Sequence, residues 1–180
     1  EIKKYTGVLK PRNFEIFKKR LEEAGMIDQA HDFMMASGKW SALLYRADIE
    51  MNLRTPEWGG FQLLDLQDYP GQGSALVGIL DAFMDSKGIV APETFYGFCA
   101  PLVPLALMKD HCWLNTQPLH IDVALSNYVE GDWNEPVRWS LVSDNGVWKR
   151  DGVLMASIPQ GKVGKAGSID LSLSGLKEAQ

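Results

Sequence analysis

The segment that most constrains the fold is a short apolar run, residues 60–68, with Gly59-Gly60 at its start and Pro70-Gly71 just after it. A run of this length between turn-forming residues predicts a buried β-strand. Helical spacing precedes it over residues 27–53, and the pattern over 74–83 predicts another helix. The order helix, strand, loop, helix is one unit of an α/β architecture. Because a strand buried on both faces needs parallel neighbours, which this sequence does not offer, we expect those neighbours upstream of this chain.

Residues 1–110 are otherwise helical in pattern. Asn13 stands before an apolar series that begins at Phe14 and is the expected N-cap of a first helix, which Gly25 should end. The second helix, over 27–53, has a possible break at Gly38.

Residues 111–180 form a second region, in which apolar and polar residues alternate between turn signals. Alternation predicts strands over 119–126 and 137–142, and Asp144-Asn145-Gly146 is a strong turn signal. Further short strands are expected over 147–149, 153–158 and 168–173. Strands of this length and spacing are typical of an antiparallel, immunoglobulin-like β-sandwich, which this part of the chain leaves incomplete.

Composition excludes several classes of function. The apolar fraction of 46% and charged fraction of 23% are those of a soluble globular protein. The net charge of -5 and the scattered basic residues argue against a nucleic-acid surface, which needs clustered Lys and Arg. No apolar stretch reaches the roughly 18 residues of a membrane span. The chain shows no signal peptide, and its three histidines have no metal-like spacing, so a zinc site is not expected.

Polar residues gather where the predicted strand ends. Side chains alternate along a strand, so Asp65 and Gln67 should point one way and Asp68 the other. Carboxylate and amide groups suit sugar hydroxyls, which need both donors and acceptors. Two structural alternatives stay open, namely that Asp68 caps the following loop and that Asp65 pairs with a buried arginine. Because Asp65 and Asp68 should face opposite sides, they are not expected to be a catalytic carboxylate pair. Trp58, just before the strand, could stack on a sugar ring.

The stretch Gly59–Lys87, with Gly-Gly-Phe, Asp-x-x-Asp and Pro-Gly-Gln-Gly-Ser-Ala-Leu-Val-Gly-Ile-Leu-Asp-Ala-Phe-Met-Asp-Ser-Lys, is similar to the end of the barrel in bacterial proteins of glycoside hydrolase family 2. Lys3–Lys10 also resembles the segment that follows strand seven in that family. The resemblance implies a (β/α)8 barrel flanked by β-sandwiches, retaining hydrolysis of β-glycosides and no organic cofactor. It implies a periplasmic or secreted parent enzyme whose two catalytic glutamates lie upstream of Glu1. This chain would then supply strand eight, with Asp65, Gln67 and Asp68 at the sugar site, but no catalytic residue.

The resemblance has one departure. Family members commonly have Trp followed by Asp or Asn at strand eight, and here the matching pair is Leu64-Asp65. Trp58 or Trp40 could take the place of that aromatic residue, and the sugar preference stays open.

Two other hypotheses compete with the enzyme fragment. A non-catalytic carbohydrate-binding module would need solvent-facing aromatic residues, for which Trp133, Trp139 and Trp148 are candidates. Trp139 alternates with polar residues, however, and is expected to fill the sandwich core. A purely structural role, in which the sandwich braces the barrel, needs no site at all.

Overall fold

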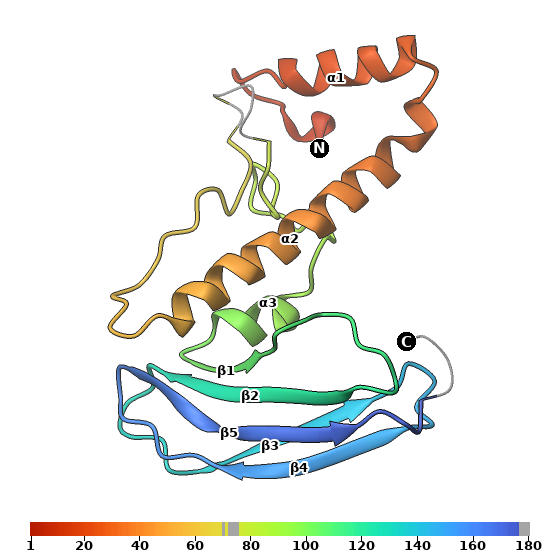
Figure 1. The fold of residues 1–180 in the computed structure, drawn as a ribbon. Helices are drawn as coiled ribbons and strands as arrows, with labels where there is room; N and C mark the ends of the chain where they lie inside the picture. Colours follow the sequence, from red (N-terminus) through yellow and green to blue (C-terminus); the bar gives the residue numbers. More distant parts are fainter. Residues whose placement is uncertain (70, 72–75, 177–180) are drawn as a thin grey trace. The chain divides into compact units, whose positions relative to one another are not determined.

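A computed structural model describes residues 1–69, 71 and 76–176 of the chain. Its contacts divide it into two compact units. Unit 1 comprises Glu1–Asp48 and Phe61–Tyr96, and unit 2 comprises Ile49–Gly60 and Gly97–Gln180. Within the described residues the fold belongs to the mixed α plus β class, with helices in the first part and antiparallel sheets in the second (Figure 1). No described helix is both long enough and apolar enough to span a bilayer. The predicted domain limits, 1–110 and 111–180, stay a prediction about the parent protein.

The helices are η1 (Ile2–Lys4), α1 (Arg12–Glu23), η2 (Ile27–Gln29), α2 (Ala30–Arg54) and α3 (Pro92–Cys99). Gly25 ends α1 as expected. Its φ of 67° lets the Gly25 amide bond the Glu22 carbonyl at 3.0 Å and the Met26 amide bond the Leu21 carbonyl at 2.9 Å, which is a Schellman motif. The expected N-cap was wrong: Pro11 caps α1, and Asn13 lies inside its first turn.

The expected break at Gly38 is also wrong, because α2 continues through it. A Cβ atom at Gly38 would lie 2.5 Å from Ile89 Cδ1, well inside van der Waals contact. Glycine here allows the buried Ile89 side chain to pack directly on the helix backbone.

The strand expected over 60–68 and the helix expected over 74–83 are not formed in the described residues. In place of a strand, residues 60–68 form one parallel β-bridge, between Gln67 and Leu80. A strand needs a partner along its length, and here the partner is only one residue long. The helix fails because the Asp81 carboxylate accepts the amides of Phe83 (2.9 Å) and Asp85 (3.0 Å), which closes a turn. Gln72 to Ala75 lie outside the described residues.

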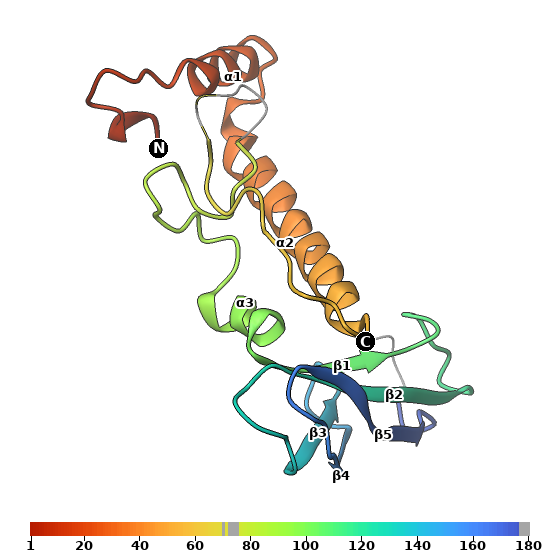
Figure 2. The same cartoon turned by 90° about the vertical axis from the view of Figure 1, so that its left-hand side faces the viewer.

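Unit 2 contains the strands β1 (Leu102–Leu107), β2 (Pro118–Asn127), β3 (Pro136–Val142), β4 (Lys149–Met155) and β5 (Lys162–Ser172). They form a three-stranded sheet in the order β1-β2-β5 and a two-stranded sheet of β3 and β4, and all pairs are antiparallel. Figure 2 shows the second sheet beneath the first. The strands expected over 119–126 and 137–142 are confirmed, as is the turn at 144–146, where Gly146 has a φ of 71°. Residues 147 and 148 are not in a strand, and β4 begins only at Lys149.

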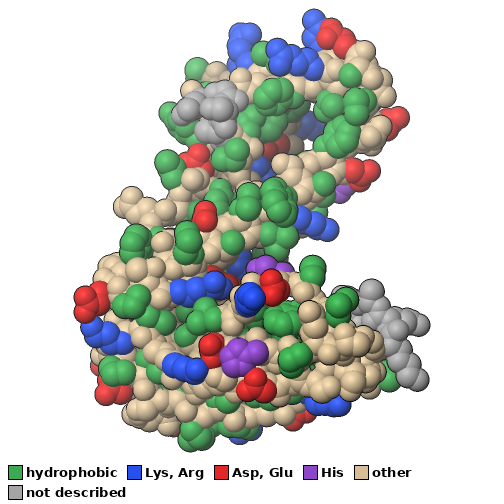
Figure 3. Space-filling view, in the orientation of Figure 1, with side chains coloured by type: hydrophobic (Ala, Val, Ile, Leu, Met, Phe, Trp, Pro, Cys, Tyr) green, Lys and Arg blue, Asp and Glu red, His purple; other side chains and the backbone are tan. Residues whose placement is uncertain are grey.

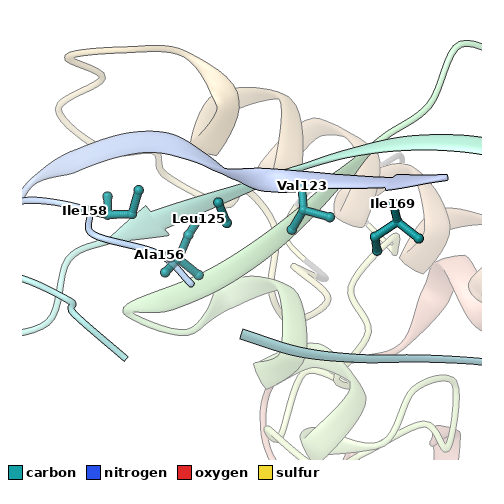
Figure 4. Packing of buried hydrophobic residues seen from close by; sticks show 6 residues of the cluster. Val123, Leu125, Ala156, Ile158 and Ile169 are labelled. Atoms are coloured by element: carbon teal, nitrogen blue, oxygen red, sulfur yellow. The ribbon is translucent and has the colours of Figure 1, made fainter. Parts of the chain in front are cut away.

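The two sheets bury a common core. Val123 and Leu125 of β2 and Ile169 of β5 point to the same side, where Ala156 and Ile158 meet them (Figure 4). Trp139 packs against this core as expected, directly across from Gly152, where a Cβ atom would lie 2.7 Å from the indole ring.

Trp133 also packs on this core, and Trp148 is buried in a neighbouring cluster with 8% of its surface exposed. The three tryptophans proposed as solvent-facing are therefore mainly core residues.

Candidate functional site

The most buried of the ion pairs described in unit 1 is that of Asp68 and Lys87. The side chain of Asp68 is fully buried and that of Lys87 is 12% exposed, and Lys87 Nζ lies 2.7 Å from the carboxylate. The Gly78 amide donates to Asp68 Oδ1 at 2.9 Å, and Lys87 Nζ donates to the Gly78 carbonyl at 2.8 Å. Buried charges are tolerated when they are paired and hydrogen-bonded in this way. Asp68 therefore has the structural role that the sequence left open, because it holds the segment that follows it.

Backbone contacts complete the same arrangement. The Asp68 amide donates to the Leu80 carbonyl and the Leu80 amide to the Leu66 carbonyl, each at 3.1 Å. A Cβ atom at Gly78 would lie 2.3 Å from the carbonyl carbon of Gln67, so any larger residue would push the two segments apart. The end of the predicted strand is thus fixed by three chain segments that meet around one carboxylate.

Asp65 and Gln67 lie on this fixed segment but face away from the ion pair. Gln67 is exposed and Asp65 is half-buried, whereas Asp68 has 2% of its surface exposed. The Tyr45 hydroxyl donates to the backbone carbonyl of Asp65 at 3.4 Å. The Asp65 carboxylate takes no part in that contact. Among the described residues Asp65 forms no salt bridge to an arginine, so they do not form the buried Asp65–Arg pair that the sequence left open. Both polar side chains thus reach solvent from a segment that hydrogen bonds to residues 78 and 80 hold in place.

A second ion-pair network joins the first residues of the chain to the turn at 81–85. Lys4 Nζ contacts the Asp81 carboxylate and lies 2.6 Å from Asp85 Oδ2, while the Tyr5 and Phe83 rings pack edge to face at 4.9 Å. The hydrogen bonds that Lys4 donates to these two carboxylates raise its pKa. Burial opposes ionisation of Asp81, but the hydrogen bonds from Lys4 and from the amides of Asp85 and Phe83 outweigh it and lower its pKa. Burial, followed by the charge of nearby Glu1, raises the pKa of Tyr5 to about 12.

Trp58, the fourth predicted site residue, belongs to unit 2. Its side chain is 42% exposed, and its carbonyl accepts a hydrogen bond from the Tyr128 hydroxyl at 2.7 Å. The structure thus brings together three of the four predicted residues, Asp65, Gln67 and Asp68.

Sequence reasoning missed Lys87, Gly78 and Lys4, which hold unit 1 together around Asp68 and Asp81. Lys87 stands 19 residues after Asp68, a separation that no local pattern connects. The available signal was the glycine between the apolar residues Val77 and Ile79, which indicates a close backbone approach.

The described residues contain no group of three or more His, Cys, Asp or Glu side chains arranged to hold a metal ion. A cavity of about 250 Å³ lies at the start of α1, lined by Lys10, Pro11, Arg12, Asn13, Phe14, Gly71 and Leu76. Asp65 and Gln67 do not line this cavity.

No protein-family model and no curated protein matches this chain.

Proposed function

We propose that this chain is one wall of the sugar site in a larger, exported glycoside hydrolase that retains configuration and cleaves β-glycosidic bonds. In this proposal unit 1 is the end of a (β/α)8 barrel of the family 2 type, and the sheets of unit 2 belong to an immunoglobulin-like sandwich. Neither catalytic glutamate lies in the chain.

The observation that carries the proposal is the outward presentation of Asp65 and Gln67 beside the buried Asp68–Lys87 pair. A carboxylate and an amide together accept from and donate to sugar hydroxyls, and hydrogen bonds specify a ligand best when their side chains are held in advance. Asp68 Oδ1 accepts hydrogen bonds from Lys87 and from the Gly78 amide, whereas Oδ2 is paired with the Lys87 charge but accepts no hydrogen bond from the described residues. Asp68 acts by supporting its neighbours.

Uncovered apolar side chains support the idea of a larger parent. In unit 1, Leu64 is 86% exposed and Trp40 of α2 is 63% exposed, and Leu43 and Leu44 are exposed beside it. Figure 3 shows hydrophobic side chains on the visible surface of this unit. Trp40, Leu43 and Leu44 stand at i, i+3 and i+4 of α2 and so share one face of the helix, and an exposed apolar face of this kind is normally covered by a partner. We assign this surface to the remainder of the parent enzyme, whose strands would pair with residues 60–68.

The proposal that the catalytic glutamates lie outside this chain can be tested directly. The purified 180-residue chain, mixed with 4-nitrophenyl β-glycosides, should release nitrophenol no faster than buffer does. Turnover at the rate of an ordinary glycosidase would show that a catalytic pair lies within the chain. The coding sequence upstream of Glu1 gives a second test, because it should encode a strand that ends in glutamate.

In the full-length enzyme, Asp65→Asn and Gln67→Ala should each lower kcat/KM by about 10- to 100-fold, the effect expected when a hydrogen bond to a charged or closely held group is lost. The control is Asp151→Asn, an exposed carboxylate of β4 in unit 2, which should leave kcat/KM unchanged. Equal rates for all three variants would refute the assignment of a sugar site to this strand end.

A further inference from the structure

Unit 2 has two exposed aromatic residues among its described residues, Trp58 and Tyr128, and the side chain of Tyr128 is hydrogen-bonded to the backbone of Trp58. Their exposed fractions are 42% and 44%, and the Tyr128 hydroxyl donates to the Trp58 carbonyl at 2.7 Å. The other tryptophans of this unit lie in or against its core. Exposed aromatic residues in one place, while the rest are buried, indicate a surface with a binding role.

Tyr128 is held by the end of the three-stranded sheet. Its amide donates to the Pro101 carbonyl at 2.7 Å, and the preceding residue, Asn127, is completely buried. The Asn127 side-chain amide donates to the carbonyls of Gly131 at 3.1 Å and Ile158 at 3.0 Å. The position from which Tyr128 reaches Trp58 is therefore set by the core of unit 2.

A second contact holds the segment that carries Trp58. Lys162, the first residue of β5, lies 3.5 Å from the carboxylate of Glu57. Glu57 itself has a φ of 62°, a conformation that residues other than glycine rarely adopt. Such backbone costs energy and is retained where surrounding contacts hold it, often at a binding surface. Tyr128 and Lys162 thus hold residues 57 and 58 at two points.

We propose that Trp58 and Tyr128, with Glu57 and Lys162 beside them, form a second sugar-binding surface on unit 2, specific for pyranose rings of β-glycosides. The inference rests on the proposed function for its class of ligand, but it uses residues of the other unit. The indole gives the apolar face of a sugar ring a flat surface, and the Glu57–Lys162 pair gives its hydroxyls an acceptor and a donor. Because the Tyr128 hydroxyl holds the backbone of Trp58 in advance, less conformational entropy is lost on binding.

The test is a titration of the full 180-residue chain with methyl β-D-galactopyranoside, methyl β-D-glucopyranoside and methyl β-D-mannopyranoside, followed by the indole N–H signals in ¹H–¹⁵N spectra. At least one glycoside should shift the Trp58 signal in a saturable way. Sorbitol, which has hydroxyl groups but no ring face, should not. A Trp58 signal that none of the three glycosides moves, or that sorbitol moves equally, overturns the proposal.

Variants separate stacking from positioning. Trp58→Ala should abolish the response, measured as shifts of neighbouring backbone amides, and Trp58→Tyr should keep it because a ring remains. Tyr128→Phe keeps the ring but removes the hydrogen bond to Trp58, and it should weaken binding by about two- to tenfold. Tyr96→Ala, which removes an exposed aromatic residue of unit 1, is the matched control and should bind like the original chain. Equal loss in Tyr96→Ala, or full binding by Trp58→Ala, contradicts the assignment.

The two proposals fail in different ways. If Trp58 gives no response while Gln67→Ala impairs the full-length enzyme, the second surface is wrong and the proposed function stands. If Trp58 responds but Asp65 and Gln67 variants have full activity, unit 2 is a sugar-binding module and the wall assigned to unit 1 is wrong.

Discussion

Replacing Lys87 by methionine tests whether the Asp68–Lys87 pair holds unit 1 together. Methionine keeps most of the length and apolar volume of the lysine side chain but removes its ammonium group. The variant would leave the Asp68 carboxylate, which is 2% exposed, with the Gly78 amide as its remaining donor among the contacts described. It would also remove the donor that Lys87 supplies to the Gly78 carbonyl.

The expected loss is large because the pair is buried. Removing one partner of a buried ion pair costs about 3–5 kcal/mol, since an uncompensated charge stays inside the protein. At about 2–4 °C per kcal/mol for a chain of this size, the melting temperature should fall by at least about 6 °C. The matched control is Lys149→Met, because Lys149 lies 3.6 Å from Asp151 with both side chains more than half exposed. Pairs of that kind contribute less than about 1 kcal/mol.

The assay is urea unfolding followed by far-ultraviolet circular dichroism, together with amide hydrogen exchange at Asp68 and Leu80, whose amides bond across this site. Lys87→Met should lower the free energy of unfolding and speed exchange at both amides, whereas Lys149→Met should do neither. The double variant Asp68→Asn/Lys87→Met removes both charges and should lose less stability than the two single variants added together. If Lys87→Met and Lys149→Met lower the free energy of unfolding by the same small amount, the Asp68–Lys87 pair does not hold unit 1 together and the reasoning is refuted.

Three further outcomes follow from the geometry. Gly78→Ala should lower the free energy of unfolding by about 1–3 kcal/mol or more in urea titrations, because its Cβ atom would clash with the backbone of Gln67. Unchanged stability would contradict the close approach of Gly78 to that backbone. Gly152→Ala should cost a similar 1–3 kcal/mol, roughly, by displacing the Trp139 ring, and Trp139→Leu in the same chain should recover part of that loss. The hydrogen bond that the protonated His120 imidazole donates to Asp170 raises the pKa of His120. This contact therefore stabilises the fold fully below the unfolded pKa of about 6.5, and its contribution is lost as pH rises through the higher folded value. An NMR titration of the imidazole should show that raised midpoint, and Asp170→Asn should lower it; a midpoint that the substitution leaves in place would exclude Asp170 as the cause.

The elements that the sequence predicted well are those with local causes. The alternation over 119–126 places Val123 and Leu125 in the core, and β2 forms there. Gly25 ends α1 because it can take a positive φ that other residues avoid. These outcomes depend on neighbours within a few residues, which the sequence displays directly.

The elements that failed depend on distant partners. Gly38 signalled a helix break, but its role is to admit Ile89, which stands 51 residues later in the chain. Residues 60–68 have the composition of a buried strand, yet a strand forms only where other strands pair with it, and among the described residues Leu80 alone does so. The pattern over 74–83 resembles a helix, but the Asp81 side chain accepts hydrogen bonds from two nearby amides and closes a turn.

The candidate site shows the same division. Alternation along the chain separated Asp68 from Gln67, and the burial of Asp68 beside exposed Gln67 agrees with that separation. Whether Asp68 would contact a ligand or support its neighbours could not be read from local residues, because the answer depends on Lys87. The exposure of Trp58 was equally undetermined, because burial depends on which side chains from elsewhere cover an indole.

By itself, the sequence determined the local properties of this protein: helix and strand periodicity, a helix end at glycine, turn positions, and polar residues on two sides of one segment. Only the tertiary structure decided that Lys87 neutralises Asp68, that Gly78 fits against the backbone beside it, and that Trp58 is held by Tyr128. The reason is physical, since backbone preference acts over a few residues, whereas burial and charge pairing depend on atoms brought close by folding.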